Sequence, residues 1–326
     1  MNLPNFTFIR PKSITDAVSE LRSPKARIHA GGTDLLGCLR DGVFGAEKLV
    51  SIGHLDKLKG FDRTQDGGVR IGALTPIAEL AASDVIRQRY PALARSAAEV
   101  ASPQLRNQGT LGGNLCQKPR CWYYRGEFTC LRKGGDKCYA YDGENQYHCI
   151  FGGSVCFITH PSDIAPALVA YDAVIRVAGE KGFREVPAGK FHILPEEDVE
   201  KETVLTSDEI ITEIFLPSPR PGLLSSYRKV RARGSWDFAL AGVALALKFQ
   251  EDVVEEARIV LSGAAPIPWR SREMEEFIIS KKIDRETAAR AAERAVKEAQ
   301  PLRKNGYKVT LFRGMIEEEL LKISKA

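Results

Sequence analysis

Short helical and short extended patterns alternate along the first hundred residues of the chain. Ser13 and Asp16 form a capping pattern that predicts a helix ending at Leu21. Thr75 and Pro76 open a second predicted helix, as its N-cap and its first helical residue. The pattern also predicts strands over 27–30 and 69–71 and a helix over 91–100. Small helix–strand units of this kind indicate an α/β or α+β arrangement.

Regular patterns return in the second half of the chain. Residues 164–177 show apolar helix and strand patterns, and the breaker cluster Ser-Pro-Arg-Pro-Gly at 218–222 predicts a domain boundary. We therefore expect one domain over 1–220 and a second over 221–326. The second domain is predicted to contain strands over 225–230 and 256–262, an apolar segment over 238–249, and helices that begin at Ser271 and Arg285.

Between these regular parts, residues 115–156 have neither a helical nor a strand period. A structureless loop of this length is improbable in a compact domain unless something ties it down. Six of the seven cysteines lie in an insertion over about 116–156, and only Cys38, on a predicted helix, lies elsewhere. The six are Cys116, Cys121, Cys130, Cys138, Cys149 and Cys156.

Composition narrows the choice of partners and location. Lys plus Arg number 47 against 42 Asp plus Glu, an excess too small to require a nucleic acid or a membrane surface. Residues 1–13 lack the apolar stretch of an export signal, and the longest apolar run, 238–247, is about half of a membrane span. We therefore expect a cytoplasmic protein whose clustered, reduced cysteines bind a metal.

Two glycine-rich loops are candidate phosphate sites. The segment Ile-His-Ala-Gly-Gly-Thr-Asp-Leu at 28–35 is a predicted strand that runs into two glycines and a possible helix cap. Backbone N–H groups can approach an anion closely there, although a tight turn alone would also explain one Gly-Gly pair. The second loop, 107–115, holds three more glycines, and two such loops suit a dinucleotide pyrophosphate. Neither loop has the Gly-x-Gly-x-x-Gly spacing of a Rossmann site.

Five motifs in order carry a family resemblance. They are Ala-Gly-Gly-Thr-Asp at 30–34, Gly-Ala-Leu-Thr at 72–75, Gly-Thr-Leu-Gly-Gly-Asn at 109–114, His-Pro-Ser-Asp-Ile-Ala-Pro-Ala at 160–167, and Tyr-Arg-Lys to Asp-Phe-Ala over 227–239. Together they resemble the FAD-binding subunit of the xanthine dehydrogenase and carbon monoxide dehydrogenase family. The resemblance implies an α+β fold: a vanillyl-alcohol-oxidase-type FAD-binding domain of two α/β subdomains, then a smaller C-terminal α/β domain.

The same resemblance implies where FAD would bind. Asp163 would bond ribityl or ribose hydroxyls, and Lys229 would lie near the isoalloxazine ring, where a cation favours the reduced flavin. A solvated surface position is the alternative for Lys229. The pyrophosphate-binding loops and the neighbouring motif residues complete the predicted set: Ala30, Gly31, Gly32, Thr33, Asp34, Leu35, Thr75, Asn107, Gly109, Thr110, Gly112, Gly113 and Asn114.

The spacing of the clustered cysteines bears on the metal. No Cys-x-x-Cys pair is present, which disfavours a zinc ribbon, although His148 and His160 could be ligands. Four thiolates on one loop suit a [4Fe–4S] cluster. Basic residues between aromatic ones could instead form a nucleic-acid surface, but a cationic shell around a negatively charged cluster is sufficient reason for them.

The insertion itself resembles that of 4-hydroxybenzoyl-CoA reductase β subunits and aldehyde oxidoreductase flavin subunits. Arg-Cys-Trp-Tyr-Tyr at 120–124 and Gly-Asp-Lys-Cys at 135–138 are shared pieces. The resemblance implies four cluster ligands, with Cys149 as the alternative to the last of them and Cys116 packed near FAD. The four are Cys121, Cys130, Cys138 and Cys156.

These expectations combine into a function. We expect an oxidoreductase subunit that relays electrons between an external carrier, such as ferredoxin or NAD, and its partners through the [4Fe–4S] cluster and FAD. The partners would be a molybdopterin-containing large subunit and a [2Fe–2S] small subunit, since the sequence has neither cofactor's pattern. A self-contained FAD oxidase and a zinc-tied scaffold are the alternatives. No nucleic acid or membrane is expected as a partner.

Overall fold

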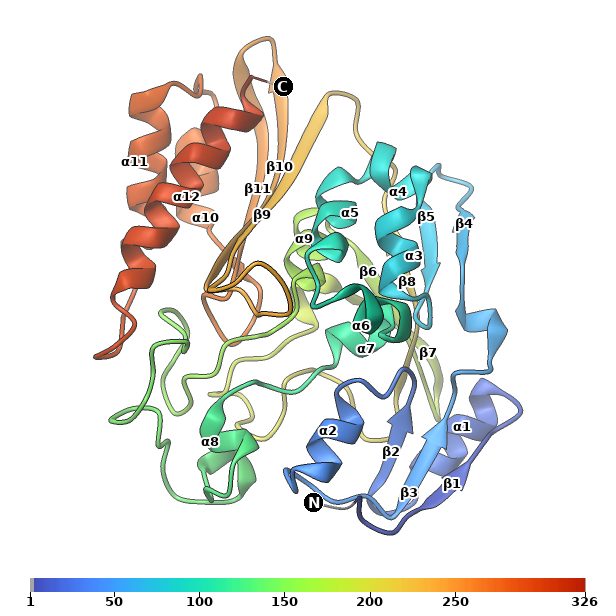
Figure 1. The fold of residues 1–326 in the computed structure, drawn as a ribbon. Coiled ribbons are helices and arrows are strands. Elements are labelled where there is room, and N and C mark those ends of the chain that lie inside the picture. Colours follow the sequence, from blue (N-terminus) through green and yellow to red (C-terminus); the bar gives the residue numbers. More distant parts are fainter. Residues whose placement is uncertain (1–2, 326) are drawn as a thin grey trace.

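The computed structural model describes residues 3–325 and begins with a small parallel sheet (Figure 1). Its strand order is β1-β3-β2, and helices α1 and α2 follow β1 and β2. The side chain of Ser13 accepts a hydrogen bond from the backbone N–H of Asp16 at 3.0 Å, which confirms the predicted cap of α1. The bounds are β1 Thr7–Ile9, α1 Ile14–Leu21, β2 Ala26–His29, α2 Leu35–Arg40 and β3 Lys48–Ser51.

A five-stranded antiparallel sheet follows, with the order β4-β5-β8-β6-β7. Its strands come from both sides of the cysteine-rich insertion, so the chain leaves this sheet and returns to it. The strands are β4 Phe61–Arg63, β5 Val69–Gly72, β6 Val174–Gly179, β7 Gly182–Pro187 and β8 Ile210–Leu216. The helices between them are α3 Ile77–Ala82, α4 Asp84–Arg89, α5 Pro91–Ala98, α6 Pro103–Gln108, α7 Leu111–Leu115 and α9 Ile164–Ala170.

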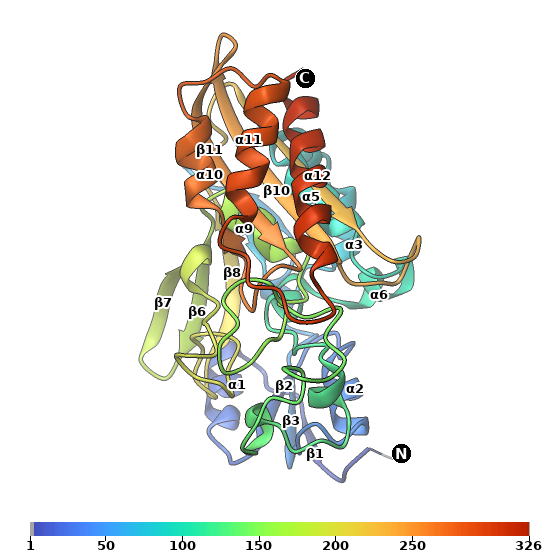
Figure 2. The same ribbon diagram turned by 90° about the vertical axis from the view of Figure 1, so that its left-hand side faces the viewer.

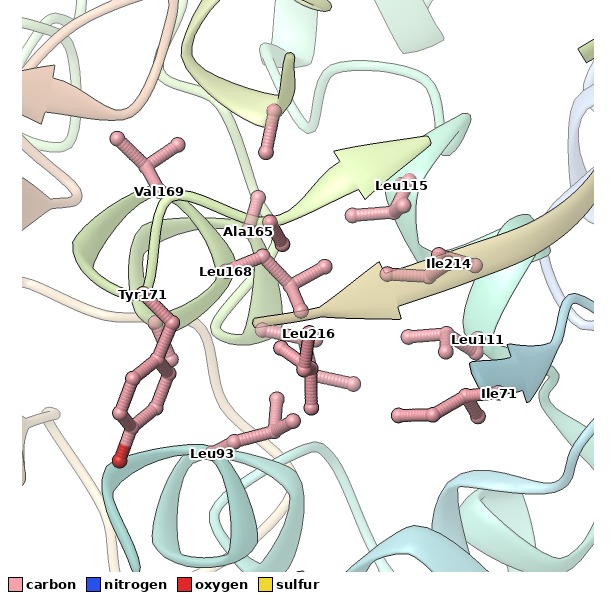
Figure 3. Close-up of a cluster of buried hydrophobic side chains, with 14 of the residues drawn as sticks. Ile71, Leu93, Leu111, Leu115, Ala165, Leu168, Val169, Tyr171, Ile214 and Leu216 are labelled. Atoms are coloured by element: carbon pink, nitrogen blue, oxygen red, sulfur yellow. The ribbon is translucent and has the colours of Figure 1, made fainter. Parts of the chain in front are cut away.

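The largest core lies between this sheet and helices α5, α7 and α9 (Figure 3). Leu93 of α5, Leu115 of α7 and Leu168 of α9 meet Ile71 of β5 and Ile214 of β8, and all five side chains are buried. Burial of apolar area of this kind is the main source of folding free energy. The core therefore fixes α7, which carries the second glycine loop.

A four-stranded antiparallel sheet of order β12-β11-β10-β9 forms the C-terminal part. Helices α10, α11 and α12 cover one face, while α5 and α9 pack against the other (Figures 1 and 2). The bounds are β9 Leu223–Val230, β10 Ala241–Gln250, β11 Val253–Ser262, β12 Trp269–Arg270, α10 Arg272–Ile278, α11 Arg285–Val296 and α12 Tyr307–Ile323. Two α/β parts and this third unit confirm the predicted fold class.

The insertion between α7 and α9 is mostly irregular, as its missing period predicts. It contains one short helix, α8 (Trp122–Arg125), and a 3₁₀ turn at Leu131–Lys133. The C-terminal part holds its far end: the side chain of Asn305 donates to the carbonyl oxygens of His148 and Cys149 at 3.1 and 3.0 Å. The insertion is thus ordered by contacts with distant segments.

Two predictions about helices fail. Helix α3 begins at Ile77 with Pro76 as its N-cap, one residue later than predicted. Thr75 is not the cap, because its hydroxyl bonds the backbone of Gly60 and its side chain is fully buried. The long helix α12 is not predicted by the sequence patterns used above. None of the helices within residues 3–325 has the length and apolar character needed to cross a membrane.

Candidate functional site

A cavity of about 1250 Å³ opens between the parallel sheet, the central core and the insertion. This exceeds the volume of about 300–1,000 Å³ usual for sites of drug-sized ligands and leaves room for a dinucleotide. Twelve of the fifteen residues predicted to hold the cofactor line it. They are Ala30, Gly31, Gly32, Thr33, Asp34, Leu35, Gly109, Thr110, Gly112, Gly113, Asn114 and Asp163.

The two glycine loops touch each other at the cavity wall. A Cβ on Gly31 would stand 2.1 Å from the carbonyl oxygen of Gln108, so only glycine permits this approach. The side-chain amide of Gln108 also donates to the carbonyl of Gly31 at 3.2 Å. Gly32 has φ +71°, a left-handed conformation that favours glycine. Both loops are therefore held side by side, as a pyrophosphate bound from two sides requires.

Helix α7 presents its first turn to the cavity. The hydroxyl of Thr110 caps it by accepting from the N–H of Gly113 at 3.2 Å. A Cβ on Gly112 would meet Ala73 at 3.1 Å, so the helix packs tightly against the residue that follows β5. By contrast, a Cβ on Gly113 would meet only the Thr110 hydroxyl, at 2.9 Å. A side chain at Gly113 thus extends into the cavity wall with little disturbance of the core.

Asp34 connects the first glycine loop to the insertion. It occupies the N-cap position of α2, but its carboxylate accepts from the Lys118 N–H at 2.7 Å and pairs with Arg120 and Arg125. Burial favours a higher pKa for Asp34, but the two guanidinium groups outweigh it and hold the pKa below its usual value. The predicted capping role of this side chain is therefore wrong, and the carboxylate instead anchors the insertion.

Asp163 forms a buried pair with Lys229 beneath the cavity. The Lys229 ammonium donates to the Asp163 carboxylate at 2.7 Å and to the carbonyls of Glu99 and Asp237. The hydroxyl of Tyr227 donates to the other carboxylate oxygen at 2.9 Å. Burial raises the pKa of Asp163, and the ammonium opposes that shift. The pair joins the α9 segment to strand β9.

Three predicted residues lie outside the cavity lining. Thr75 is buried against Gly60, and Asn107 lies on α6. Lys229 lies behind Asp163, and its side chain is fully buried, so the surface alternative for it is wrong. The roles predicted for these three residues stay predictions, and none of the three lines the cavity.

The loop between β9 and β10 supplies a wall that motif reasoning did not assign. Arg233, Trp236 and Phe238 line the cavity, and Trp236 is largely exposed with φ +53°. The Arg120 guanidinium lies over the Phe238 ring at 4.9 Å. The two aromatic residues in the Gly-Ser-Trp-Asp-Phe segment could have indicated this wall from the sequence. Exposed aromatic rings beside a cavity are typical of ligand contact.

The cysteines of the insertion come together on one side of the cavity. The thiol of Cys156 lowers the pKa of Cys138, and the thiol of Cys138 raises the pKa of Cys156. Burial, and then the nearby thiols of Cys138 and Cys130, raise the pKa of Cys121 to about 11. Within residues 3–325 all seven cysteines are free thiols. The four predicted cluster ligands are therefore neighbours.

The geometry of these donors is not that of a single-ion site. Within the described part of the chain, no group of three or more His, Cys, Asp or Glu side chains converges as one bound ion requires. A zinc ion holds its ligands at about 2.0–2.3 Å, whereas a cubane takes each cysteine on a separate iron and spaces them more widely.

Cys149 has different surroundings from the four grouped cysteines. Its thiol is almost fully buried, its N–H bonds the Phe157 carbonyl at 3.0 Å, and burial raises its pKa to about 12. The Lys308 ammonium opposes this shift, and the nearby Cys138 thiol adds to it. Cys38 is buried on α2, as predicted, and Cys116 lines the cavity.

Comparison with known proteins identifies the family. Residues 4–136 and 142–219 match the family described as FAD binding domain in molybdopterin dehydrogenase, and residues 225–323 match the CO dehydrogenase flavoprotein C-terminal domain. The chain therefore belongs to the FAD-binding medium subunits of the xanthine dehydrogenase and CO dehydrogenase family, a family of oxidoreductase subunits. The domain boundary at residue 220 stays a prediction.

Particular relatives cover most of the chain. The aldehyde oxidoreductase FAD-binding subunit PaoB of Escherichia coli K12 is 37% identical over 270 residues, 81% of this chain and 83% of the relative. The carbon monoxide dehydrogenase medium chain of Hydrogenophaga pseudoflava is 28% identical over 301 residues, 91% of this chain and 88% of the relative. A solved structure of carbon monoxide dehydrogenase from the same organism has a TM-score of 0.78 at 26% identity and covers 99% of this chain and 98% of its own.

Proposed function

We propose that this subunit relays electrons through FAD in the cavity and a [4Fe–4S] cluster held by four cysteines of the insertion. The proposed ligands are Cys121, Cys130, Cys138 and Cys156. The route would run between an external carrier, such as ferredoxin or NAD, and partner subunits that carry [2Fe–2S] centres and molybdopterin. FAD exchanges electrons singly or in pairs, and a cubane exchanges one at a time. The cytoplasmic location stays a prediction.

The chain's own groups suit a flavin dinucleotide. The paired glycine loops offer close backbone approach for the pyrophosphate. Asp163 lines the cavity with a carboxylate held in place by Lys229 and Tyr227, so it can accept from ligand hydroxyls without reorganising. Phe238 and Trp236 supply apolar surface for a ring.

One observation supports the proposed electron relay most directly. The cavity and the group of proposed cysteine ligands are bordered by the same side chains. Tyr124 and Arg132 belong to the insertion and line the cavity. Tyr124 also packs in the same buried cluster as Cys121 and Cys130, and the Arg132 guanidinium is close enough to Cys156 for their charges to interact. Side chains that line the proposed flavin site thus also border the proposed cluster site.

Charges around these side chains fit an anionic cluster. Arg132 is almost fully buried and pairs with Glu202, which also pairs with Lys118. Two cations against one carboxylate leave an excess positive charge beside the thiols. A cubane with four thiolates carries net negative charge, which such a shell offsets in a low-dielectric surrounding.

Cys156 is favoured over Cys149 as the fourth ligand. The Cys138 thiol is the largest influence on the pKa of Cys156, whereas burial is the largest influence on the pKa of Cys149 and Cys138 is a lesser one. Cys156 also stands shortly before His160, so ligation there would tie the end of the insertion to the flavin motif. Ligation by Cys149 would leave the residues between Cys149 and the flavin motif without this anchor.

Iron analysis with EPR of two alanine variants tests this assignment. Cys156→Ala is expected to lose the cluster or degrade it to a three-iron form, while Cys149→Ala keeps about four irons per FAD, as in wild type. Full iron content in Cys156→Ala together with loss in Cys149→Ala would reverse the assignment. If anaerobically purified wild type showed flavin absorbance but contained no iron, the cluster proposal would be refuted. The self-contained FAD oxidase would then be the better hypothesis.

A further inference from the structure

One histidine of the insertion touches a proposed cluster ligand. The imidazole Nε2 of His148 lies 3.2 Å from the sulfur of Cys121. The side chain is buried, and among residues 3–325 no atom pairs with its Nδ1. Burial, and then the nearby Lys308 ammonium, lower the pKa of His148 to about 4. The only polar contact of this ring is thus the thiol.

The C-terminal part of the chain holds His148 in that place. The ammonium of Lys308, on α12, donates to the carbonyls of His148 at 3.0 Å, Tyr147 at 3.3 Å and Gly263 at 2.8 Å. The side chain of Asn305 donates to the His148 carbonyl as well. Lys308 is fully buried, and its three acceptors are all backbone carbonyls. A buried ammonium among neutral acceptors is costly unless a negative charge lies nearby.

We propose that His148 donates a hydrogen bond from Nε2 to the Cys121 thiolate and that Lys308 is the positioning residue for it. The two together raise the reduction potential of the cluster, so the C-terminal part of the chain sets the potential of a centre bound by the insertion. This inference rests on the proposed function, since it requires the [4Fe–4S] cluster.

The position of the proton follows from the ligand chemistry. A thiol could donate to an unprotonated Nε2, but an iron-bound Cys121 has lost its proton and can only accept. Two lone pairs at the observed N–S distance would repel each other, so Nε2 must carry the hydrogen. This holds for the neutral ring and for the protonated one.

The direction of the effect follows from electrostatics. Reduction adds negative charge to the cluster, and a donor to a ligand sulfur stabilises the more negative state. Burial of His148 and Lys308 keeps water from screening the interaction. Removing either group should therefore make the cluster harder to reduce.

The test compares cluster midpoints in the full-length protein by EPR-monitored redox titration. His148→Phe should keep its iron but shift the cluster to lower potential by about tenfold in the reduction equilibrium, which for one electron is about 59 mV. His148→Gln retains an N–H near the same position and should recover part of the shift. Lys308→Met should shift the midpoint in the same direction.

Control variants distinguish a failure of the His148 proposal from a failure of the proposed function. His54→Phe removes a histidine that bonds the Pro11 carbonyl at 2.8 Å and should leave the cluster midpoint unchanged. The FAD midpoint and FAD content of every variant serve as internal measures of folding. An unchanged cluster midpoint in His148→Phe with full iron would overturn the inference and leave the cluster intact. Conversion to a three-iron form would make His148 an iron ligand and also overturn it. Wild type without iron would refute the proposed function itself.

Discussion

The glycine loops and the cysteine insertion meet at one cavity but are positioned in different ways. Gly31 follows strand β2 and Gly113 lies in the middle of helix α7, and the other residues of these short elements pack into buried cores. The insertion is almost free of regular structure, and its polar anchors, including Asp34, Glu202 and Lys308, lie 70 to 161 positions away in the sequence. Each glycine loop takes its own shape from local structure, whereas the cysteine insertion takes its shape from long-range contacts.

The largest expected effect concerns the buried pair that joins the two sides of the fold. Lys229→Met leaves the Asp163 carboxylate buried without its cation, which should lower the free energy of unfolding by about 3–5 kcal/mol. Urea denaturation measures it. Iron content should stay near that of wild type, because the insertion is held by other anchors.

A matched control for that change lies in the same sheet. Lys248 on β10 pairs with Glu255 near the surface, so Lys248→Met should cost under about 1 kcal/mol. Equal losses in the two variants would show that the buried pair adds nothing. Loss of iron in Lys229→Met would show that the two regions are not independently held.

The next effect separates the two cofactors. Gly113→Val should place a branched side chain where the proposed pyrophosphate approaches the backbone, and weaken FAD binding by about 2–3 kcal/mol, on the order of 100-fold. Iron per chain should persist, since the four proposed ligands lie in the insertion that follows α7. Gly113 is a cleaner position than Gly32, where the positive φ adds backbone strain.

FAD titration followed by flavin fluorescence gives the result. Gly314→Val, on α12 where a Cβ meets open space, is the control and should bind FAD normally. If Gly113→Val retained wild-type FAD affinity, this loop would not be part of the phosphate site.

The smallest effect is at the residue that touches both regions. Asp34→Asn loses a carboxylate that pairs with Arg120 and Arg125, at a cost of about 2 kcal/mol in unfolding free energy. The folded pKa of Asp34 lies below its unfolded value of about 3.9. The pair's stabilisation is therefore present above that value and is lost as pH falls through the folded pKa.

Unfolding at several pH values checks this. The difference between wild type and Asp34→Asn should be constant near neutrality and shrink below about pH 4. A difference that stayed the same down to pH 2 would mean that the carboxylate charge contributes nothing.

Local signals predicted much of the fold and most of the cavity. The Ser13 cap, strand β5 and the glycine loops were readable because each depends on residues a few positions apart. Helix α12 was missed because its apolar residues form no clean stripe, and its buried Lys308 makes contacts that appear only in the fold. The sequence also could not predict that the Lys229 side chain points toward Asp163, because that contact forms only when the chain is folded.

The insertion shows the same limit more strongly. Cysteine clustering predicted a metal site, and the family resemblance implied four ligands. Neither predicted that Asp34 and Glu202 anchor the loop or that Tyr124 and Arg132 line the cavity. Such contacts join segments with no periodic relation to each other. Spacing cannot encode them.

The most direct test of the central claim is a count of electrons taken up by the anaerobically purified chain. FAD accepts two and one cubane accepts one, so reductive titration of wild type should consume about three electrons per FAD. Broad iron–sulfur absorbance should bleach in the same titration. Consumption of about two electrons per FAD, with only flavin bands changing, would contradict the account.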